Sequence, residues 1–278
     1  MKIKIVWLML VLIFVSGCGD STDNAQVEDT VTIENTVFSE KEDAEQNNND
    51  VEVEEDEENS YKNMSGKVVV LGDSLWGLDK GPEGIAGCLE EITSLEVKNY
   101  CIPGTCAARI EGFSGTKDSM IAILVDNQDA RSEEIRNEIS ESQYVFIEHC
   151  NNDYSMGVPT TGEDNCYEQA LLDSISVIKE LNPEVQIVMI LPTLGYLINM
   201  EKLTSEYDSG SGTIDAYIDV MKSVAEKEGA RVVDMQKAWT LTKENWSEYL
   251  VDGAHLKKEA RREYAAYLAQ ELNRLIEN

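Results

Sequence analysis

The feature that most constrains the fold is an alternation, beyond residue 64, of short apolar runs with longer amphipathic segments. Short runs rich in β-branched residues are typical of strands buried on both faces. Strands that alternate with helices pair in parallel through right-handed crossovers. The order therefore predicts a three-layer α/β/α domain around an open, doubly wound, mostly parallel five-stranded sheet. The expected strands are 67–71, 95–100, 144–148, 185–191 and 231–235, and the expected helices are 132–140, 165–181, 214–228 and 257–276.

The first 18 residues read as an export signal. Two lysines precede an unbroken run of 11 apolar residues, Ile5 to Val15. A bilayer core needs about 20 apolar residues, so this run is more typical of the apolar region of a signal peptide. The sequence that follows, VSGC at 15–18, resembles a bacterial lipobox. The resemblance implies a diacylglycerol on Cys18, and two acyl chains give a stable membrane anchor. An ordinary signal peptide cleaved nearby, or a short anchor, is the alternative.

Residues 19–63 form a strongly acidic segment. They hold 16 acidic residues and 2 lysines, a net charge of −14. Such a composition buries too little apolar surface to offset the entropy of ordering, and its like charges repel. We therefore expect a disordered acidic tether that holds a single folded domain, 64–278, away from the extracytoplasmic face of the cell membrane. A calcium-binding or cell-wall-binding role for the acidic run is the alternative.

Charge also limits the partners. The chain has 53 acidic and 23 basic residues, a net charge of −30, and only 2 histidines. A nucleic-acid binder needs a basic face for the phosphates, so that class is excluded. Two histidines exclude a His-rich metal cage, and we expect neither a metal nor another cofactor.

Four short segments gather polar residues at the ends of expected strands or at the start of a helix. Ligands of open α/β sheets bind at the carboxyl ends of the strands. Each segment alone is typical of a turn or a helix start. Their occurrence together, in this order, predicts one site. The segments are Gly72-Asp73-Ser74-Leu75, the loop around Gly104, Asn151-Asn152-Asp153, and Asp252-Gly253-Ala254-His255.

This set resembles the four motifs of the GDSL, or SGNH, hydrolase family, and the resemblance runs from Lys67 to about Leu268. It implies that Ser74 is the nucleophile, that Asp252 and His255 complete a triad, and that Gly104 and the side chain of Asn152 help to form an oxyanion hole. The third motif departs from the family, which usually has glycine two places before the asparagine. Cys150 occupies that place here, and the turn there is expected to differ.

The residue types support the same chemistry. A serine hydroxyl needs a neighbouring base, and His255 is the best candidate because imidazole titrates near neutrality. Asp252 can fix its tautomer and stabilise the imidazolium. The N–H groups of Ser74 and Gly104 and the amide of Asn152 can bind the oxyanion. Few basic residues lie in these loops, which favours a carbonyl ester over a phosphoryl substrate. A degenerate relative that kept the turns and lost the activity is the alternative.

Two neighbouring polar residues are given structural roles. Asp73 is expected to accept backbone N–H bonds in the turn that carries the serine. His149, at the end of the third expected strand, is expected to face packing or a loop rather than substrate.

If Cys18 is lipidated, an odd number of cysteines remains for an exported domain, in which disulfides are permitted. The remaining five are Cys88, Cys101, Cys106, Cys150 and Cys166. Spacing leads to two hypotheses, the bridges Cys101–Cys106 and Cys150–Cys166. A metal site built from the second pair with His149 and Asp153 is the alternative, but its spacing matches no standard zinc pattern.

The substrate is inferred from location, charge and aromatic residues. An acidic domain repels anionic polymers, and aromatic rings near the site could stack on sugars, although packing is the commoner role. No long apolar lid is evident. We therefore expect hydrolysis of short acyl esters, O-acetyl groups of a neutral carbohydrate, through an acyl-enzyme intermediate. An acyltransferase on the same fold and an inactive solute- or glycan-binding lipoprotein are the alternatives. The aromatic residues are Trp76, Tyr154, Tyr196, Trp239 and Trp246.

Overall fold

The computed structural model describes residues 61, 64–110, 117–162 and 164–277. The expected signal peptide with Cys18, and all of the expected tether except Tyr61, lie outside the described residues. Within the described part of the chain, no helix combines the length and the apolar character needed to cross a membrane.

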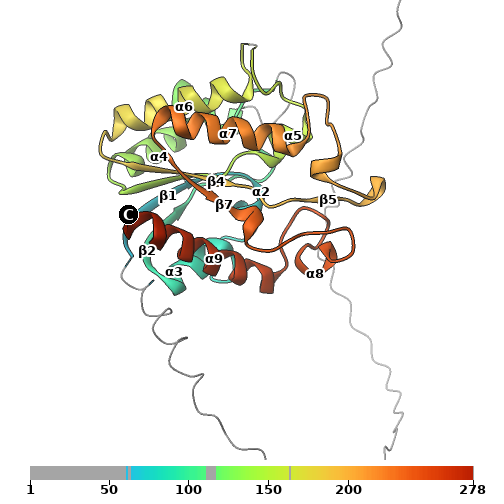
Figure 1. Ribbon diagram of the computed structural model, residues 1–278. Helices are drawn as coiled ribbons and strands as arrows, with labels where there is room; N and C mark the ends of the chain where they lie inside the picture. The colour runs from blue at the N-terminus through green and yellow to red at the C-terminus, as the bar shows by residue number, and fades with distance from the viewer. Residues whose placement is uncertain (1–60, 62–63, 111–116, 163, 278) are drawn as a thin grey trace, which may run out of the picture. The chain divides into compact units, whose positions relative to one another are not determined.

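The described residues form a parallel five-stranded sheet in the order β2-β1-β3-β4-β7 (Figure 1). All four pairings in this sheet are parallel, which confirms the predicted doubly wound α/β fold. The chain starts at β1 near the centre, moves outward to β2, then crosses back to β3 and continues to the other edge. The strands are β1 (Ser65–Leu71), β2 (Ser94–Asn99), β3 (Tyr144–Ile147), β4 (Gln186–Leu191) and β7 (Arg231–Asp234).

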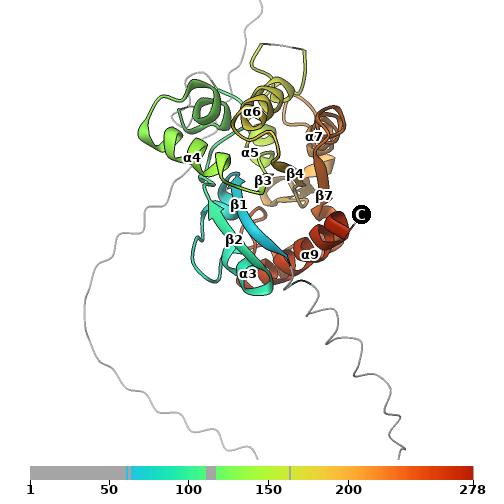
Figure 2. The same cartoon turned by 90° about the vertical axis from the view of Figure 1, so that its left-hand side faces the viewer.

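Helices cover both faces of the sheet (Figures 1 and 2). One face carries α3 (Ile85–Ile92) and α9 (Lys258–Glu277), which pack together. The other face carries α4 (Ala130–Ser140), α6 (Tyr167–Leu181) and α7 (Ile214–Glu228). The four helices expected from periodicity are all present, within two residues at each end. Helix α3 was not expected, because its sequence IAGCLEEI contains a glycine and is only two turns long.

The two layers bury separate hydrophobic cores because successive strand residues point to opposite faces. In β3, Val145 and Ile147 belong to the core under α4, α6 and α7, whereas Phe146 belongs to the core under α3 and α9. In β1, Val69 lies in the first of these cores and Val70 in the second. Both faces are apolar, which is why these strands are nearly continuous apolar runs.

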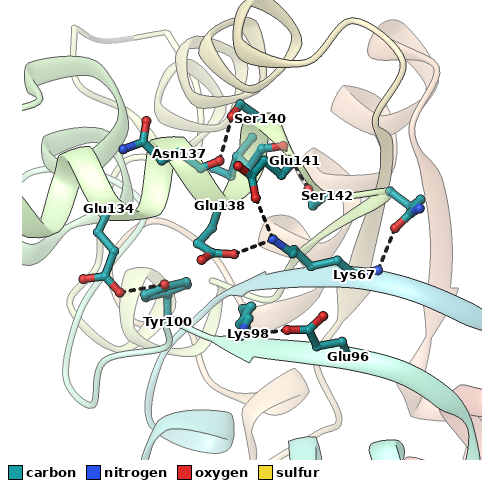
Figure 3. Close-up of polar contacts among 12 residues, drawn as sticks. Lys67, Glu96, Lys98, Tyr100, Glu134, Asn137, Glu138, Ser140, Glu141 and Ser142 are labelled. Atoms are coloured by element: carbon teal, nitrogen blue, oxygen red, sulfur yellow. Dashed lines mark hydrogen bonds and ion pairs between the residues drawn. The ribbon is translucent and has the colours of Figure 1, made fainter.

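Polar contacts connect α4 to the sheet at two places, near the start of β1 and just after the end of β2 (Figure 3). The Nζ atom of Lys67, in β1, lies 3.0 Å from carboxylate oxygens of both Glu138 and Glu141. The hydroxyl of Tyr100, just after β2, donates to Glu134 at 2.9 Å. These contacts fix how the helix lies across the first two strands.

The five described cysteines are all free, buried thiols, so both disulfide hypotheses are wrong. Their sulfur atoms face different surroundings. The thiol of Cys101 points to the carbonyl of Val70 in β1, at 3.8 Å. The Sγ of Cys166 accepts the N–H of Gln169 at 3.4 Å, where it caps α6. Spacing in the sequence could not reveal these directions. Among the described residues, no three histidine, cysteine or acidic side chains come together as a metal site requires.

Candidate active site

Ser74 lies in a sharp turn between β1 and the short helix α2 (Ser74–Gly77). The turn is tight: a Cβ on Gly72 would lie 2.6 Å from Oε2 of Glu148, so any side chain at 72 would force Glu148 to move. Asp73 is buried and caps α2, accepting the N–H of Leu75 at 3.1 Å. The backbone hydrogen bond expected for Asp73 is therefore present. The turn exposes part of Ser74 at the carboxyl end of a central strand.

His255 joins Ser74 to Asp252. Its Nε2 lies 2.9 Å from Oγ of Ser74, and its Nδ1 lies 2.7 Å from Oδ2 of Asp252. A carboxylate can only accept, so it fixes the proton on Nδ1 and leaves Nε2 to accept the serine proton. The other oxygen of Asp252 accepts the N–H groups of Ala254 and His255 at 3.1 and 2.9 Å. Burial acts against the charge, but these bonds prevail and the pKa of Asp252 lies below its usual value.

A small hairpin supports the loop that carries His255. It comprises β5 (Tyr196–Leu197) and β6 (Lys202–Leu203) and was not expected from the sequence. The N–H of Tyr196 donates to the carbonyl of Gly253 at 2.7 Å. Gly253 has a φ of +85°, and a Cβ there would lie 2.0 Å from the carbonyl oxygen of Tyr196. Glycine is thus required between Asp252 and His255. Figure 1 shows β5 beside α8 (Trp246–Tyr249) at one end of the sheet.

The two further oxyanion candidates lie on adjoining loops. Asn152 is in the first turn of α5 (Asn151–Ser155), and its Nδ2 donates to the carbonyl of Thr105 at 2.9 Å. Gly104 has a φ of +78° and nothing within 4 Å of the position a Cβ would take. The backbone N–H of Asn152 also points to the carboxyl of Asp73. The turn of Ser74, the Gly104 loop and α5 therefore lie together.

The backbone geometry of Cys150 explains why the third motif can lack the glycine that is usual in the family. Cys150 caps α5 with a φ of −165° and a ψ of −48°. Because this φ is negative, the position does not require glycine in this chain. The side chain is buried, and burial raises the pKa of its thiol well above the usual value, which keeps it uncharged.

Two buried acids lie near the site. The sequence indicates Asp153 only as an alternative metal ligand, and it assigns no role to Glu148. Asp153 is fully buried and accepts the N–H groups of Ala107 and Ala108 at 2.8 and 3.1 Å. It therefore anchors the loop that follows Gly104, and burial raises its pKa to about 7. Glu148 is fully buried directly after β3. The only signal in the sequence for a role of Glu148 was its position, because a charged residue at the end of an apolar strand is unusual.

The aromatic residues do not form one sugar-stacking surface. Trp76 and Tyr154 are buried in the two hydrophobic cores, so the stacking interpretation is wrong for both. Trp239 lies flat on Tyr249, with ring centroids 4.9 Å apart. The remaining two stack on each other: the rings of Tyr196 and Trp246 lie 4.8 Å apart.

His149 is buried, as expected. Burial lowers its pKa to about 4. The imidazole is therefore neutral at physiological pH, away from the hydrogen bonds that join Ser74, His255 and Asp252.

A serine in a strand–turn–helix, hydrogen-bonded to a His–Asp pair at the carboxyl end of a parallel sheet, defines a serine ester hydrolase of the α/β class. The chain matches the model of the GDSL-like lipase/acylhydrolase family over residues 70–263, and it belongs to this family. No protein in a search of curated proteins was similar enough to match.

Solved structures with the same fold are distant in sequence. A protein from Lactobacillus plantarum is 16% identical, with a TM-score of 0.56 over 76% of this chain and 98% of its own. The lipase/acylhydrolase from Enterococcus faecalis is 18% identical, with a TM-score of 0.50 over 75% of this chain and 96% of its own. Est24, a carbohydrate acetylesterase from Sinorhizobium meliloti, is 12% identical, with a TM-score of 0.50 over 75% of this chain and 99% of its own.

Proposed function

We propose that this chain is an extracytoplasmic, lipid-anchored serine esterase that removes short acyl groups, above all O-acetyl groups, from a neutral carbohydrate. The observation that carries the esterase mechanism is His255, whose two ring nitrogens contact Ser74 at 2.9 Å and Asp252 at 2.7 Å. This arrangement can take a proton from the serine and stabilise the imidazolium that results.

The proposed reaction has two halves. Oγ of Ser74 attacks the ester carbonyl while Nε2 of His255 takes its proton; the same nitrogen then returns the proton to the departing sugar hydroxyl. A water molecule, deprotonated by His255, then attacks the acyl carbonyl. The carboxylic acid is released, and the proton passes from His255 to Oγ of Ser74. The N–H groups of Ser74 and Gly104 and the amide of Asn152 hold the oxyanion in both halves. One such donor contributes about 3 kcal/mol to the transition state.

Three features support the substrate and the location. One structural neighbour, Est24, is described as a carbohydrate acetylesterase. The acidic composition of residues 64–278 disfavours anionic polymers, because their charges would be repelled. The sequence VSGC at 15–18 follows an apolar run of export-signal length, which supports acylation of Cys18.

The test uses the full chain in detergent. A fluorophosphonate probe and p-nitrophenyl acetate are applied to the wild type, to Ser74→Ala and to His255→Ala, with Ser140→Ala, at the end of α4, as the matched control. We expect labelling and turnover in the wild type and the control, and loss of both in the two site variants. A well-folded wild type that neither labels nor turns over would contradict the esterase mechanism.

Substrate and anchor need their own measurements. Acetate release from acetylated xylan is compared with hydrolysis of a long-chain p-nitrophenyl ester; a preference for the long chain would contradict the deacetylase assignment. For the anchor, the chain is expressed in a bacterium fed radiolabelled fatty acid. Label and membrane association should both be lost in Cys18→Ser, and their persistence would contradict lipidation at that residue.

A further inference from the structure

A second carboxyl is buried directly behind the turn that carries Ser74. Glu148 is 0% exposed and Asp73 is 1% exposed. The N–H of Asp73 donates to Oε2 of Glu148 at 3.3 Å, and the N–H of Glu148 donates to the carbonyl of Leu71 at 2.9 Å. Oε2 of Glu148 also lies close to Gly72, since a Cβ on Gly72 would be 2.6 Å from it. Glu148 therefore contacts the turn through both its backbone and its side chain.

The side chain of His255 acts on Asp73 and lowers its pKa, but no lysine or arginine of the described residues neutralises the two carboxyls. Among the described residues, neither takes part in an ion pair with lysine or arginine. Two adjacent negative charges removed from water are strongly unfavourable, so such a pair keeps a proton. Burial raises the pKa of Asp73 to about 6, against the effect of the backbone N–H groups that stabilise its charge, and Glu148 is the better site for the proton. Burial, reinforced by the charge of Asp73, raises the pKa of Glu148 well above its usual value.

Within the described part of the chain, Glu148 also faces titratable groups other than Asp73, and these groups are neutral. The side chains that act on it electrostatically, besides Asp73, are thiols and phenols. Burial raises the pKa of each of them well above its usual value, so all are neutral at physiological pH. They are Cys101 after β2, Cys150 at the start of α5, Tyr167 in α6 and Tyr264 in α9.

Several polar atoms around this pair are buried without a hydrogen-bond partner. They come from the turn, from the residue after β3, from α2 and from α9, and they make this a polar region inside the core under α3 and α9. A neutral acid suits such a place, since it both donates and accepts. The atoms are Oδ2 of Asp73, Oε1 of Glu148, Nε1 of Trp76 and the hydroxyl of Tyr264.

We propose that Glu148 is a positioning residue that works as a neutral, hydrogen-bonding carboxyl: it holds Asp73 and, through Asp73, keeps Ser74 in line with His255. The proposal rests on the proposed serine esterase function. Asp73 accepts the backbone N–H of Leu75, and the backbone N–H of Asn152 lowers the pKa of the same carboxyl, so the position of Asp73 affects both the turn of Ser74 and the start of α5. A charged Glu148 would repel the carboxylate of Asp73 and shift the turn. Glu148 touches no substrate and moves no proton in the reaction.

Two substitutions separate this role from simple packing. In Glu148→Gln the side chain becomes a neutral amide of the same shape. Its oxygen can still accept the N–H of Asp73, and its NH2 group replaces the O–H as a donor. In Glu148→Met the volume is kept but the hydrogen bonding is lost. We expect kcat on p-nitrophenyl acetate within about threefold of the wild type for the glutamine variant. For the methionine variant, we expect a loss of about 100-fold in kcat with little change in KM, as for a misplaced nucleophile. Glu138→Gln, in α4, is the matched control.

A spectroscopic signal reports the proton itself. The infrared spectrum of the full chain at pH 7 should contain the carbonyl stretch of a protonated carboxyl, and this band should weaken in Glu148→Gln but not in Glu138→Gln. Circular dichroism and thermal unfolding verify that each variant is folded. If Glu148→Met does not fold, the proposal is tested by the infrared comparison and by the activity of Glu148→Gln.

Three results would overturn the proposal: a folded methionine variant as active as the wild type, a glutamine variant as impaired as the methionine one, or a band unaffected by Glu148→Gln. Failure of the proposed function has a different signature. In that case the wild type itself shows no fluorophosphonate labelling and no turnover, whatever residue stands at 148.

Discussion

Nε2 of His255 lies 2.9 Å from the hydroxyl oxygen of Ser74, although 181 residues separate the two in the chain. Ser74 follows the central strand β1, whereas His255 precedes α9, which packs against α3 beneath the sheet. The contact between His255 and Ser74 therefore depends on the crossover connections, which bring α9 back to the face of the sheet under β1. Several predictions about the site depend on how the His255 loop is held.

Asp252→Asn should remove most activity without unfolding the domain. The asparagine amide can present a donor to Nδ1, which favours the tautomer whose Nε2 carries the proton and cannot accept one from Ser74. We expect kcat to fall by about 10⁴-fold with KM little changed. Steady-state kinetics on p-nitrophenyl acetate measure this, with Asp215→Asn on the exposed side of α7 as control. A loss of less than tenfold would mean that Asp252 does not orient His255.

Gly253→Ala should damage both activity and stability. The new Cβ would lie 2.0 Å from the carbonyl oxygen of Tyr196, so the hairpin or the His255 loop must move. Gly229→Ala is the matched control. It has a similar φ of +65° but nothing within 4 Å of its Cβ, and strain alone should cost about 1 kcal/mol.

Thermal unfolding and kcat of the two glycine variants are compared in one buffer. We expect Gly253→Ala to lose at least about tenfold in kcat and Gly229→Ala to keep the wild-type rate. Equal effects in both variants would show that strain, and not the contact with Tyr196, is the reason for glycine at 253.

The sheet and the contacts of His255 with Ser74 and Asp252 were predictable because they depend on local patterns. Apolar runs such as 185–191 identify strands, and parallel pairing places the loops after β1 and β3 at one end of the sheet. The His–Asp contact follows from a spacing of three residues. Family resemblance added Gly104 and Asn152, which no spacing rule would have selected. The structure joins Asn152 to the loop of Gly104 through Thr105.

What could not be predicted depends on where side chains point. The hairpin of β5 and β6 has only two residues in each strand, too few for a periodic signal. Trp76 follows the nucleophile closely in sequence, yet its ring turns into the core and meets Tyr264 edge-on at 6.3 Å. The pairing of Asp73 with Glu148 joins residues 75 positions apart. Each of these depends on tertiary packing that a one-dimensional pattern does not contain.

The thiols of the folded domain should be unreactive and unbridged. All five cysteines of the described residues are buried and free, and burial raises the pKa of Cys101 and Cys150 well above the usual value. A protonated thiol is a poor nucleophile. We expect Ellman's reagent to modify none of them in the native state and all five in denaturant, with or without prior reduction. A mass deficit of two hydrogens in the non-reduced digest would contradict this.

Asp153 should make the stability of the domain depend on pH in an unusual direction. Burial raises its pKa from 3.8 to about 7 in the folded state, although the N–H groups of Ala107 and Ala108 favour its charged form. Between these values the folded state keeps a proton that the unfolded state has released. The free energy of unfolding therefore decreases as pH rises from about 4 to about 7, by up to about 1.4 kcal/mol per pH unit for one proton.

The test compares the wild type with Asp153→Asn by urea denaturation at several pH values. His149 has the opposite effect, because burial lowers its pKa to about 4, but it is present in both proteins and cancels in the difference. We expect the wild type to lose stability relative to Asp153→Asn as pH rises from 4 to 7, and the difference to level off above 7. The asparagine can accept only one of the two N–H groups, which adds a cost independent of pH.

A difference that is flat across this range would show that Asp153 is already charged at pH 4. The loop after Gly104 would then be held by an ionised carboxylate whose pKa is close to the usual value for aspartate.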